Sequence, residues 1–203
     1  GGAAKLAFTT QPSASTVAGS AFATQPVVTV QDANGNTVTG STASVTLTLT
    51  TGTGTLGGTA TMDAVAGVAN FSGKGLNINL AGTNKVLTAT SGVLATATTS
   101  PAFTITPGAA SKVVFTTQPS ASTAAGTAFA TQPVVTVQDA NGNTVTGSTA
   151  SVTLTLSTGT GTLGGTATMN AVAGVADFAG KGLNISLVGT NKVLTATSGV
   201  LVT

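Results

Sequence analysis

Apolar and polar residues alternate along several short stretches of the chain. The clearest of them is Val45-Thr46-Leu47-Thr48-Leu49, and the same alternation runs through residues 5–9, 28–30, 76–80, 86–89 and 103–105. Since successive side chains of a strand point to opposite faces of a sheet, this period of two predicts strands with one buried and one solvated face. Clusters of Gly, Pro and Asn, which favour turns, separate the stretches. We therefore predict an all-β chain of short antiparallel strands.

The sequence repeats itself over the length of a whole domain. Residues 5–96 align without a gap with residues 112–203, at an offset of 107, and 11 of these 92 positions differ. The period is that of a complete domain, because a solenoid repeat has only about 20–50 residues. With about seven short strands in each copy, the pattern is typical of an immunoglobulin-like antiparallel β-sandwich. We predict two tandem sandwiches, over residues 1–107 and 108–203.

The stretch 97–107, ATTSPAFTITP, has no counterpart after Thr203. If it supplies the last strand of the first sandwich, the second sandwich lacks that strand and exposes unpaired backbone groups at a sheet edge. Two explanations stay open. Either the chain, which starts at Gly1-Gly2, is a portion of a longer array, or a neighbouring chain supplies the strand by complementation.

The composition excludes several functions. The chain has 44 Thr and 27 Gly but no Cys, His, Trp, Tyr, Arg or Glu. Its apolar fraction of 41% and net charge of +2 indicate a folded protein, because disordered chains combine low hydrophobicity with high net charge. Acid–base and nucleophilic catalysis typically need His or paired carboxylates, and zinc sites need Cys or His. We predict that the protein is not an enzyme and has no catalytic, cofactor-binding or metal-binding residues and no cofactor.

The same composition limits the partners. Six lysines form no basic stripe and no Trp or Tyr offers a stacking surface, so we expect no nucleic-acid partner. No run approaches the roughly 18 apolar residues of a membrane helix, so we expect no membrane insertion. A surface with few charges offers little repulsion between copies. The expected partners are neighbouring identical repeats in the same chain, and further copies through the open sheet edge.

Two loops resemble ligand sites but are better explained as turns. The loop Asp32-Ala33-Asn34-Gly35-Asn36, repeated at 139–143, has oxygen-bearing side chains at alternate positions, but it lacks the glycine and glutamate spacing of an EF-hand. Asn-Gly between apolar runs predicts instead a hairpin with a type I′ turn. The glycine-rich stretch 51–58 lacks the lysine and helix of a phosphate-binding loop, so we predict a flexible connection there. Asp32 and Asp139 are the only acids that both copies share.

Two further hypotheses concern side chains outside these loops. Thr46 and Thr48 lie on one strand face, where a regular threonine array could bind carbohydrate, although alternating Thr is usually the solvated side of a sheet. An intramolecular lysine cross-link is the other hypothesis. Its ingredients are the shared lysines (Lys5, Lys74 and Lys85), the asparagines Asn77 and Asn84 and the acid Asp32.

The order of these motifs resembles the bacterial Ig-like repeats of large cell-surface proteins of the invasin and intimin type. The most specific pieces are VTVQDANGN, GVANF and LTATSG, and the resemblance covers essentially the whole of each copy. Such repeats usually carry an aromatic residue just before the LTATS strand, whereas this chain has Lys85 and Val86. The resemblance implies an extracellular stalk that holds an adhesive or enzymatic head away from the cell.

We therefore expect a non-catalytic structural repeat that acts as an extracellular stalk or spacer of a bacterial surface protein or adhesin. The alternative is a self-assembling extracellular fibre or surface-layer subunit joined by strand complementation. A carbohydrate-binding module is the second alternative. The absence of Trp and Tyr argues against it, because sugar sites commonly stack rings on aromatic faces.

Overall fold

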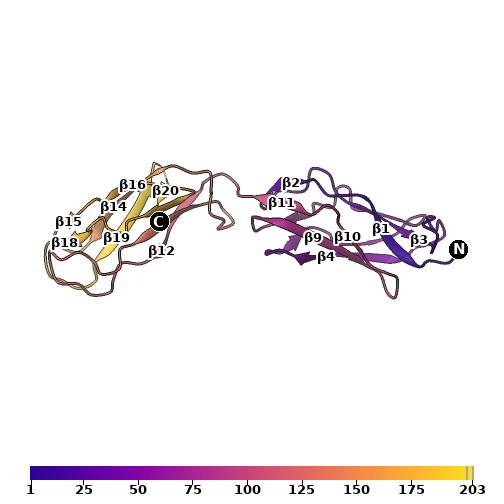
Figure 1. Cartoon of the computed structure of the whole chain (residues 1–203), viewed down its shortest axis with the longest axis horizontal. Helices are drawn as coiled ribbons and strands as arrows, with labels where there is room; N and C mark the ends of the chain where they lie inside the picture. Colours follow the sequence, from indigo (N-terminus) through magenta and orange to yellow (C-terminus); the bar gives the residue numbers. More distant parts are fainter. Residues whose placement is uncertain (200, 203) are drawn as a thin grey trace. The chain divides into compact units, whose positions relative to one another are not determined.

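The protein is built from β-strands. A computed structural model describes residues 1–199 and 201–202, and no helix occurs among them, hence none that could cross a membrane. The chain divides into two compact units, unit 1 (Gly1–Pro107) and unit 2 (Gly108–Thr203) (Figure 1). Each unit is an antiparallel β-sandwich of immunoglobulin type with its own core, so the predicted fold class is confirmed.

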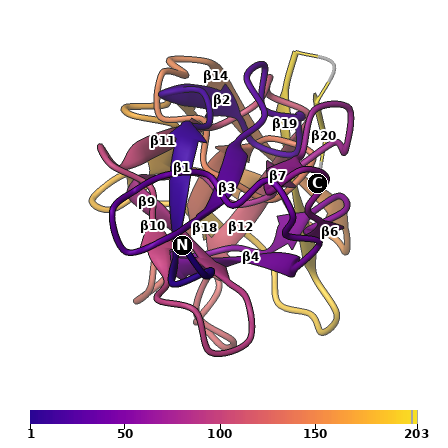
Figure 2. The ribbon, with the colours of Figure 1, turned by 90° about the vertical axis from the view of Figure 1, so that its right-hand side faces the viewer.

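The first sheet of unit 1 holds three strands. Strand β3 lies between β1 and β7, and both pairings are antiparallel (Figure 2). The register places Leu6 opposite Val30 and Val28 opposite Ala69, and all four side chains are buried. One face of this sheet therefore packs into the core. The strands are β1 (Lys5–Thr10), β3 (Val27–Gln31) and β7 (Val68–Asn70).

The second sheet of unit 1 has the strand order β2-β11-β9-β4-β6, with β10 also beside β9. Strand β2 runs parallel to β11, whereas the other pairings are antiparallel. The segment that enters the unit thus gives β1 to one sheet and β2 to the other. The strands are β2 (Ser15–Val17), β4 (Ser44–Thr51), β6 (Thr61–Asp63), β9 (Gly82–Thr90), β10 (Ala97–Thr98) and β11 (Phe103–Thr106), and a separate pair is β5 (Leu56–Gly57) with β8 (Asn77–Ile78).

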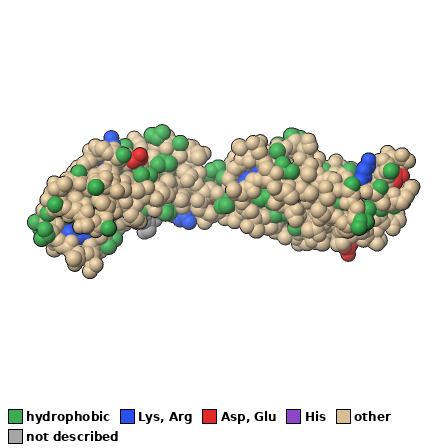
Figure 3. All heavy atoms as spheres, turned by 60° about the horizontal axis from the view of Figure 1, so that its bottom comes forward, with side chains coloured by type: hydrophobic (Ala, Val, Ile, Leu, Met, Phe, Trp, Pro, Cys, Tyr) green, Lys and Arg blue, Asp and Glu red, His purple; other side chains and the backbone are tan. Residues whose placement is uncertain are grey.

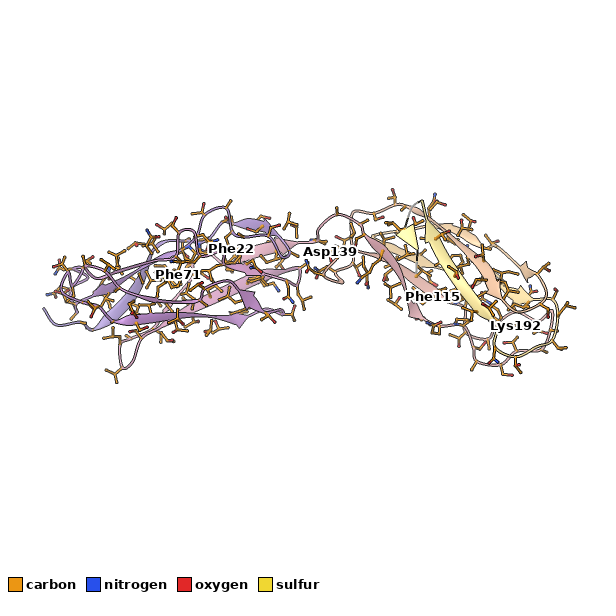
Figure 4. The ribbon with its side chains drawn as sticks, turned by 180° about the vertical axis from the view of Figure 1, so that it is seen from behind. Phe22, Phe71, Phe115, Asp139 and Lys192 are labelled. Atoms are coloured by element: carbon orange, nitrogen blue, oxygen red, sulfur yellow. The ribbon has the colours of Figure 1, made fainter. Side chains whose placement is uncertain are left out.

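The core of unit 1 is aliphatic with three buried phenylalanines. Phe71 is fully buried, and the edge of the Phe22 ring meets the face of Phe103, with ring centroids 5.5 Å apart and planes at 74°. Figure 4 shows Phe22 and Phe71 inside this unit. The predicted alternation along β4 is confirmed, because Val45 and Leu47 are buried while Thr48 is exposed.

Unit 2 repeats this plan, with sheets β12-β13-β17 and β16-β14-β19-β20 and the pair β15-β18. Its core is separate and includes Phe178, Leu154 and Leu183. The strands are β12 (Lys112–Thr117), β13 (Val134–Gln138), β14 (Ser151–Thr158), β15 (Leu163–Gly164), β16 (Thr168–Asn170), β17 (Val175–Asp177), β18 (Asn184–Ile185), β19 (Val193–Ser198) and β20 (Leu201–Val202).

The two units differ at one sheet edge. Within the described part of unit 2, no strand takes the position of β11, as the sequence predicts. The segment 122–124 corresponds to β2 but is not a strand either. In unit 1 the only strand that pairs with β2 is β11. Among the described residues of unit 2, neither β2 nor β11 therefore has a counterpart strand.

Two details of the predicted elements are wrong. The loop 32–36 does reverse the chain, with a bridge between Gln31 and Thr37, but its turn is not type I′. That type needs positive φ at both central residues, and here Gly35 (φ 90°) has positive φ whereas Asn34 does not. The Gly35 N–H donates to the Asp32 carbonyl at 3.1 Å, so a type I turn precedes a left-handed glycine.

The predicted strand over residues 76–80 shrinks to the two residues of β8. Buried and partly buried positions alternate from Leu76 to Asn79. Asn77 and Ile78 pair with β5, whereas the backbone groups of Leu76 bond to a loop. The Leu76 N–H donates to the Gln25 side chain, and the Leu76 carbonyl accepts from the Phe22 N–H at 2.8 Å. Unit 1 consequently has eleven strands, several of only two or three residues.

Candidate functional site

The acid that both units share is a structural clamp for the turn that follows it. In unit 2, Asp139 Oδ1 accepts the backbone N–H groups of Asn141 and Asn143 at 2.9 and 2.8 Å. Its other oxygen, Oδ2, accepts the Asn143 side-chain amide at 2.9 Å and the backbone N–H of Gly108 at 2.8 Å. One buried carboxylate thus closes the 139–143 turn and fastens the first residue of the unit to it.

Asp32 does the same work in unit 1. Its Oδ1 accepts the N–H groups of Asn34 and Asn36 at 3.0 and 2.9 Å, and the Gly1 nitrogen lies 3.2 Å from its Oδ2, in the place of Gly108. Hydrogen bonds from the side chain and backbone of Asn36 lower the pKa of Asp32 to about 2, against burial, which raises it. The carboxylate is therefore ionised at neutral pH and receives amide donors.

The pKa of Asp139 is also lowered. Burial alone would raise it, but the N–H of Gly108 and the side-chain and backbone donors of Asn143, with Asn141, outweigh that effect. No group of three or more His, Cys, Asp or Glu residues that could hold a metal occurs in residues 1–199 and 201–202. The oxygen-rich loop of the sequence is thus a hydrogen-bonded turn in both units.

The sequence analysis missed a second clamp, formed by Gln25 and, in unit 2, by Gln132. Gln25 Nε2 donates to the carbonyls of Phe22 and Leu76 at 3.0 and 3.1 Å, and its Oε1 accepts the Leu76 N–H at 3.0 Å. Gln132 makes the same three bonds to Phe129 and Leu183. The signal in the sequence is a Gln-Pro pair that recurs unchanged inside an apolar stretch, where a polar side chain needs partners.

Lys85 is the one lysine of unit 1 that is fully buried. Its Nζ donates to the Thr53 carbonyl, and its stem passes beneath the glycine-rich loop. A Cβ on Gly52 would lie 2.5 Å from Lys85 Cδ, so this position needs glycine for close approach as well as for its φ of 94°. The loop 51–58 is thereby a cover for the lysine stem. Its counterpart Lys192, labelled in Figure 4, is partly exposed.

Replacing Lys85 with methionine is expected to raise the free energy of unfolding of unit 1 at pH 7. Burial lowers the pKa of Lys85 below the usual 10.5, so between the two values the unfolded chain binds more protons than the folded chain. The stability of the parent therefore increases as the pH rises toward 10.5, and the advantage of Lys85→Met shrinks over the same range. Denaturant unfolding followed by circular dichroism measures both.

Lys192→Met is the matched control, because that side chain is partly exposed in an equivalent position. It should change the free energy of unfolding at pH 7 less than Lys85→Met does. If Lys85→Met and the parent chain gained stability equally between neutral pH and pH 10.5, the burial argument would be wrong.

Threonine hydroxyls on neighbouring strands hydrogen-bond to one another. The Thr46 and Thr61 hydroxyls lie 3.0 Å apart, and those of Thr50 and Thr88 lie 2.7 Å apart, each pair across neighbouring strands. Such cross-strand pairs stabilise a sheet by a few tenths of a kcal/mol up to about 1 kcal/mol each. In the view of Figure 3, charged side chains form small separate patches among side chains and backbone that are mostly neither charged nor hydrophobic.

The ingredients of the hypothetical cross-link have other partners. Lys85 is held by the Thr53 carbonyl, and the Asn77 side chain donates to the Gly75 carbonyl at 2.9 Å. Asn84 takes a left-handed turn conformation with φ of 56°. Asp32, the acid that would assist the reaction, is occupied by its own turn.

No known family matches the sequence, and no curated protein matches it. Among solved structures, a β-glycosidase from Bacteroides vulgatus is 13% identical with a TM-score of 0.40 over 97% of this chain, which spans about a quarter of its length (24%). The D0-D1 domain of intimin (17% identity, TM-score 0.33) matches over 98% of this chain and 92% of its own. Domains 4 and 5 of the S-layer protein SbsC (16%, 0.32) match over 98% and 93%. Both of these alignments extend over nearly the whole of this chain.

Proposed function

We propose that the protein is a non-catalytic spacer in an extracellular protein of a bacterial surface, in which tandem sandwiches carry another part of that protein away from the cell. The observation that carries the proposal is what the shared polar side chains do. Asp32 and Asp139, Gln25 and Gln132, and Lys85 are all bonded to backbone groups of their own unit. The ionisable and amide side chains that both units share therefore stabilise the fold.

The repeat supports the same role. A spacer must tolerate long exposure to solvent and must be extendable by duplication, and here the two units differ at 11 of 92 aligned positions and each has its own core. Repeats of this kind stabilise themselves largely independently, so copies can be added without redesign of the others.

The proposal is tested by comparing the maximum dimension of chains that contain increasing numbers of units. We would insert one and two further copies of residues 1–107 ahead of the present chain and measure the maximum dimension of each protein by small-angle X-ray scattering. A spacer requires a constant increment of at least about 25 Å per unit, the length of an eight-residue strand. A dimension that levels off as copies are added would contradict the proposal.

A further inference from the structure

Unit 2 contains an open groove of about 700 Å³ along one sheet edge. Its walls are residues 118–125 on one side and residues 187–194 on the other, with Phe129 and Ile185 between them. Three large apolar side chains in its wall are exposed to solvent. These are Leu187 (55% exposed), Val188 (82%) and Val193 (49%), whereas none of their counterparts in unit 1 is a large exposed hydrophobic residue.

In unit 1 the same groove is filled by β11. That strand runs antiparallel to β9, with Phe103 opposite Lys85 and Ile105 opposite Gly82, and parallel to β2, with Thr104 opposite Ser15. Its two apolar side chains enter the core, where Phe103 is 2% and Ile105 is 1% exposed. Thr104 and Thr106, which alternate with them, lie on the other face of the strand.

Residues next to the groove are more exposed in unit 2 than their counterparts in unit 1. Three side chains of unit 1 are 0% exposed, namely Ile78, Lys85 and Leu87. Their counterparts in unit 2, Ile185, Lys192 and Leu194, are partly exposed. The 18 residues that line the groove match unit 1 at all but two positions. The two exceptions, Ala124 for Val17 and Val188 for Ala81, are apolar in both units.

We propose that this groove is a binding site for an extended polypeptide segment with the side-chain pattern of β11, Phe-Thr-Ile-Thr. The segment lies between residues 122–124 and residues 189–192, which precede β19, parallel to the former and antiparallel to the latter. Its phenylalanine lies opposite Lys192 and packs on Phe129, and its isoleucine lies opposite Gly189. This is recognition by strand addition, in which backbone hydrogen bonds supply affinity and alternate side-chain pockets supply specificity.

The chemistry of the groove favours this occupant over others. Lys192 is its only charged side chain, so an acidic or basic segment would be buried without a full set of partners. The Phe129 ring is in the place of Phe22, which in unit 1 meets Phe103 edge to face. The binding activity is independent of the spacer role, since a spacer of fixed length needs no ligand.

The experiment uses the whole chain and a dye-labelled synthetic peptide, TSPAFTITPG, with the sequence of residues 99–108. Fluorescence anisotropy should show saturable binding of one peptide per chain. A control peptide with Phe103→Ser and Ile105→Ser should bind at least about tenfold more weakly, because it loses the two buried apolar side chains. Equal binding of the two peptides, or no binding of the first, would overturn the proposal.

Two surface variants of the chain locate the site. Leu187→Asp places a charge in the groove wall, and Val172→Asp places one at an even more exposed valine outside the groove, so neither alters a buried position. Leu187→Asp should weaken peptide binding about tenfold or more and Val172→Asp should leave it unchanged. Equal effects of the two changes would place the peptide elsewhere.

A disulfide trap tests the register of the segment. The chain has no cysteine, so Ser122→Cys gives it one thiol, next to the place predicted for Thr104 of the peptide. A peptide with Thr104→Cys, supplied as its 2-thiopyridyl disulfide, should react with this thiol and release thiopyridone faster than the same peptide activated at Ala102→Cys, because only the first brings the two Cα atoms within disulfide range. Equal rates would contradict the register in which Thr104 lies opposite Ser122.

Protection of Lys192 from an amine-acylating reagent gives a readout on the unmodified chain. Bound peptide should slow acylation of Lys192 and leave Lys181, which does not line the groove, unaffected. Sedimentation separates the other occupant, a second copy of the chain. If the chain self-associates with Lys192 protected, and excess peptide does not dissociate it, a different surface of a second copy fills the groove. That result would count against the proposal.

Discussion

Replacing Phe71 with alanine is expected to lower the free energy of unfolding of unit 1 by about 3–5 kcal/mol. The Phe71 side chain is fully buried in the core between the two sheets of unit 1, and its removal leaves a cavity that the neighbouring side chains refill only in part. Unit 2 has its own Phe178 at the equivalent place in a separate core. Differential scanning calorimetry should therefore show one transition shifted to lower temperature and one unchanged.

Phe178→Ala is the matched variant and should shift the other transition. The pair of variants tests the division of the chain into two independent cores as well as the contribution of the ring. If both transitions moved together in either variant, the two sandwiches would unfold as one cooperative body, and the assignment of separate cores would be wrong.

Replacing Asp139 with alanine is expected to cost unit 2 about 2–4 kcal/mol. The carboxylate accepts four amide hydrogen bonds from three residues, and bonds to a charged acceptor contribute about 1.5–3 kcal/mol each when considered singly. Three of the four donors belong to one short turn, so the losses overlap and the sum is not reached. Denaturant unfolding followed by circular dichroism measures the change.

Asp63→Asn controls for the removal of a carboxylate as such. Asp63 is exposed, and unit 2 has Asn170 at the equivalent position, so this change should stay within about 0.5 kcal/mol. A loss below that value for Asp139→Ala would show that the turn and the Gly108 contact hold without the carboxylate. Amide hydrogen exchange at Gly108 should rise in the alanine variant and not in the control.

The strand pattern could be predicted where burial follows local alternation. Val45 to Leu49 is such a case, because a period of two is visible without knowledge of any partner. The stretch from Leu76 to Leu80 has the same period but becomes a two-residue strand. The backbone groups of Leu76 bond to the Gln25 side chain and to the Phe22 N–H, some fifty residues away, which alternation does not report.

The candidate sites were predictable to different extents. The sequence identifies Asp32 and Asp139 as the shared acids and places them in a turn, but the turn type differs because Asn34 keeps negative φ. The burial of Lys85 could not be predicted, since a lysine within an apolar run gives no sign of the loop that covers it. The sequence repeat predicts that no described residue of unit 2 takes the place of β11. The groove could not be predicted, because it also depends on the pairing of β2 with β11, which the sequence does not reveal.

Asp139 and the Gly108 amide that it holds belong to the same copy of the repeat, as do Asp32 and Gly1. A duplication of the 107-residue segment consequently transmits its own fastening, and each new copy brings both halves of the attachment. The residue at the junction must only keep its backbone N–H. Glycine and most other amino acids satisfy this condition, but proline at position 108 does not, although proline occupies the position immediately before it.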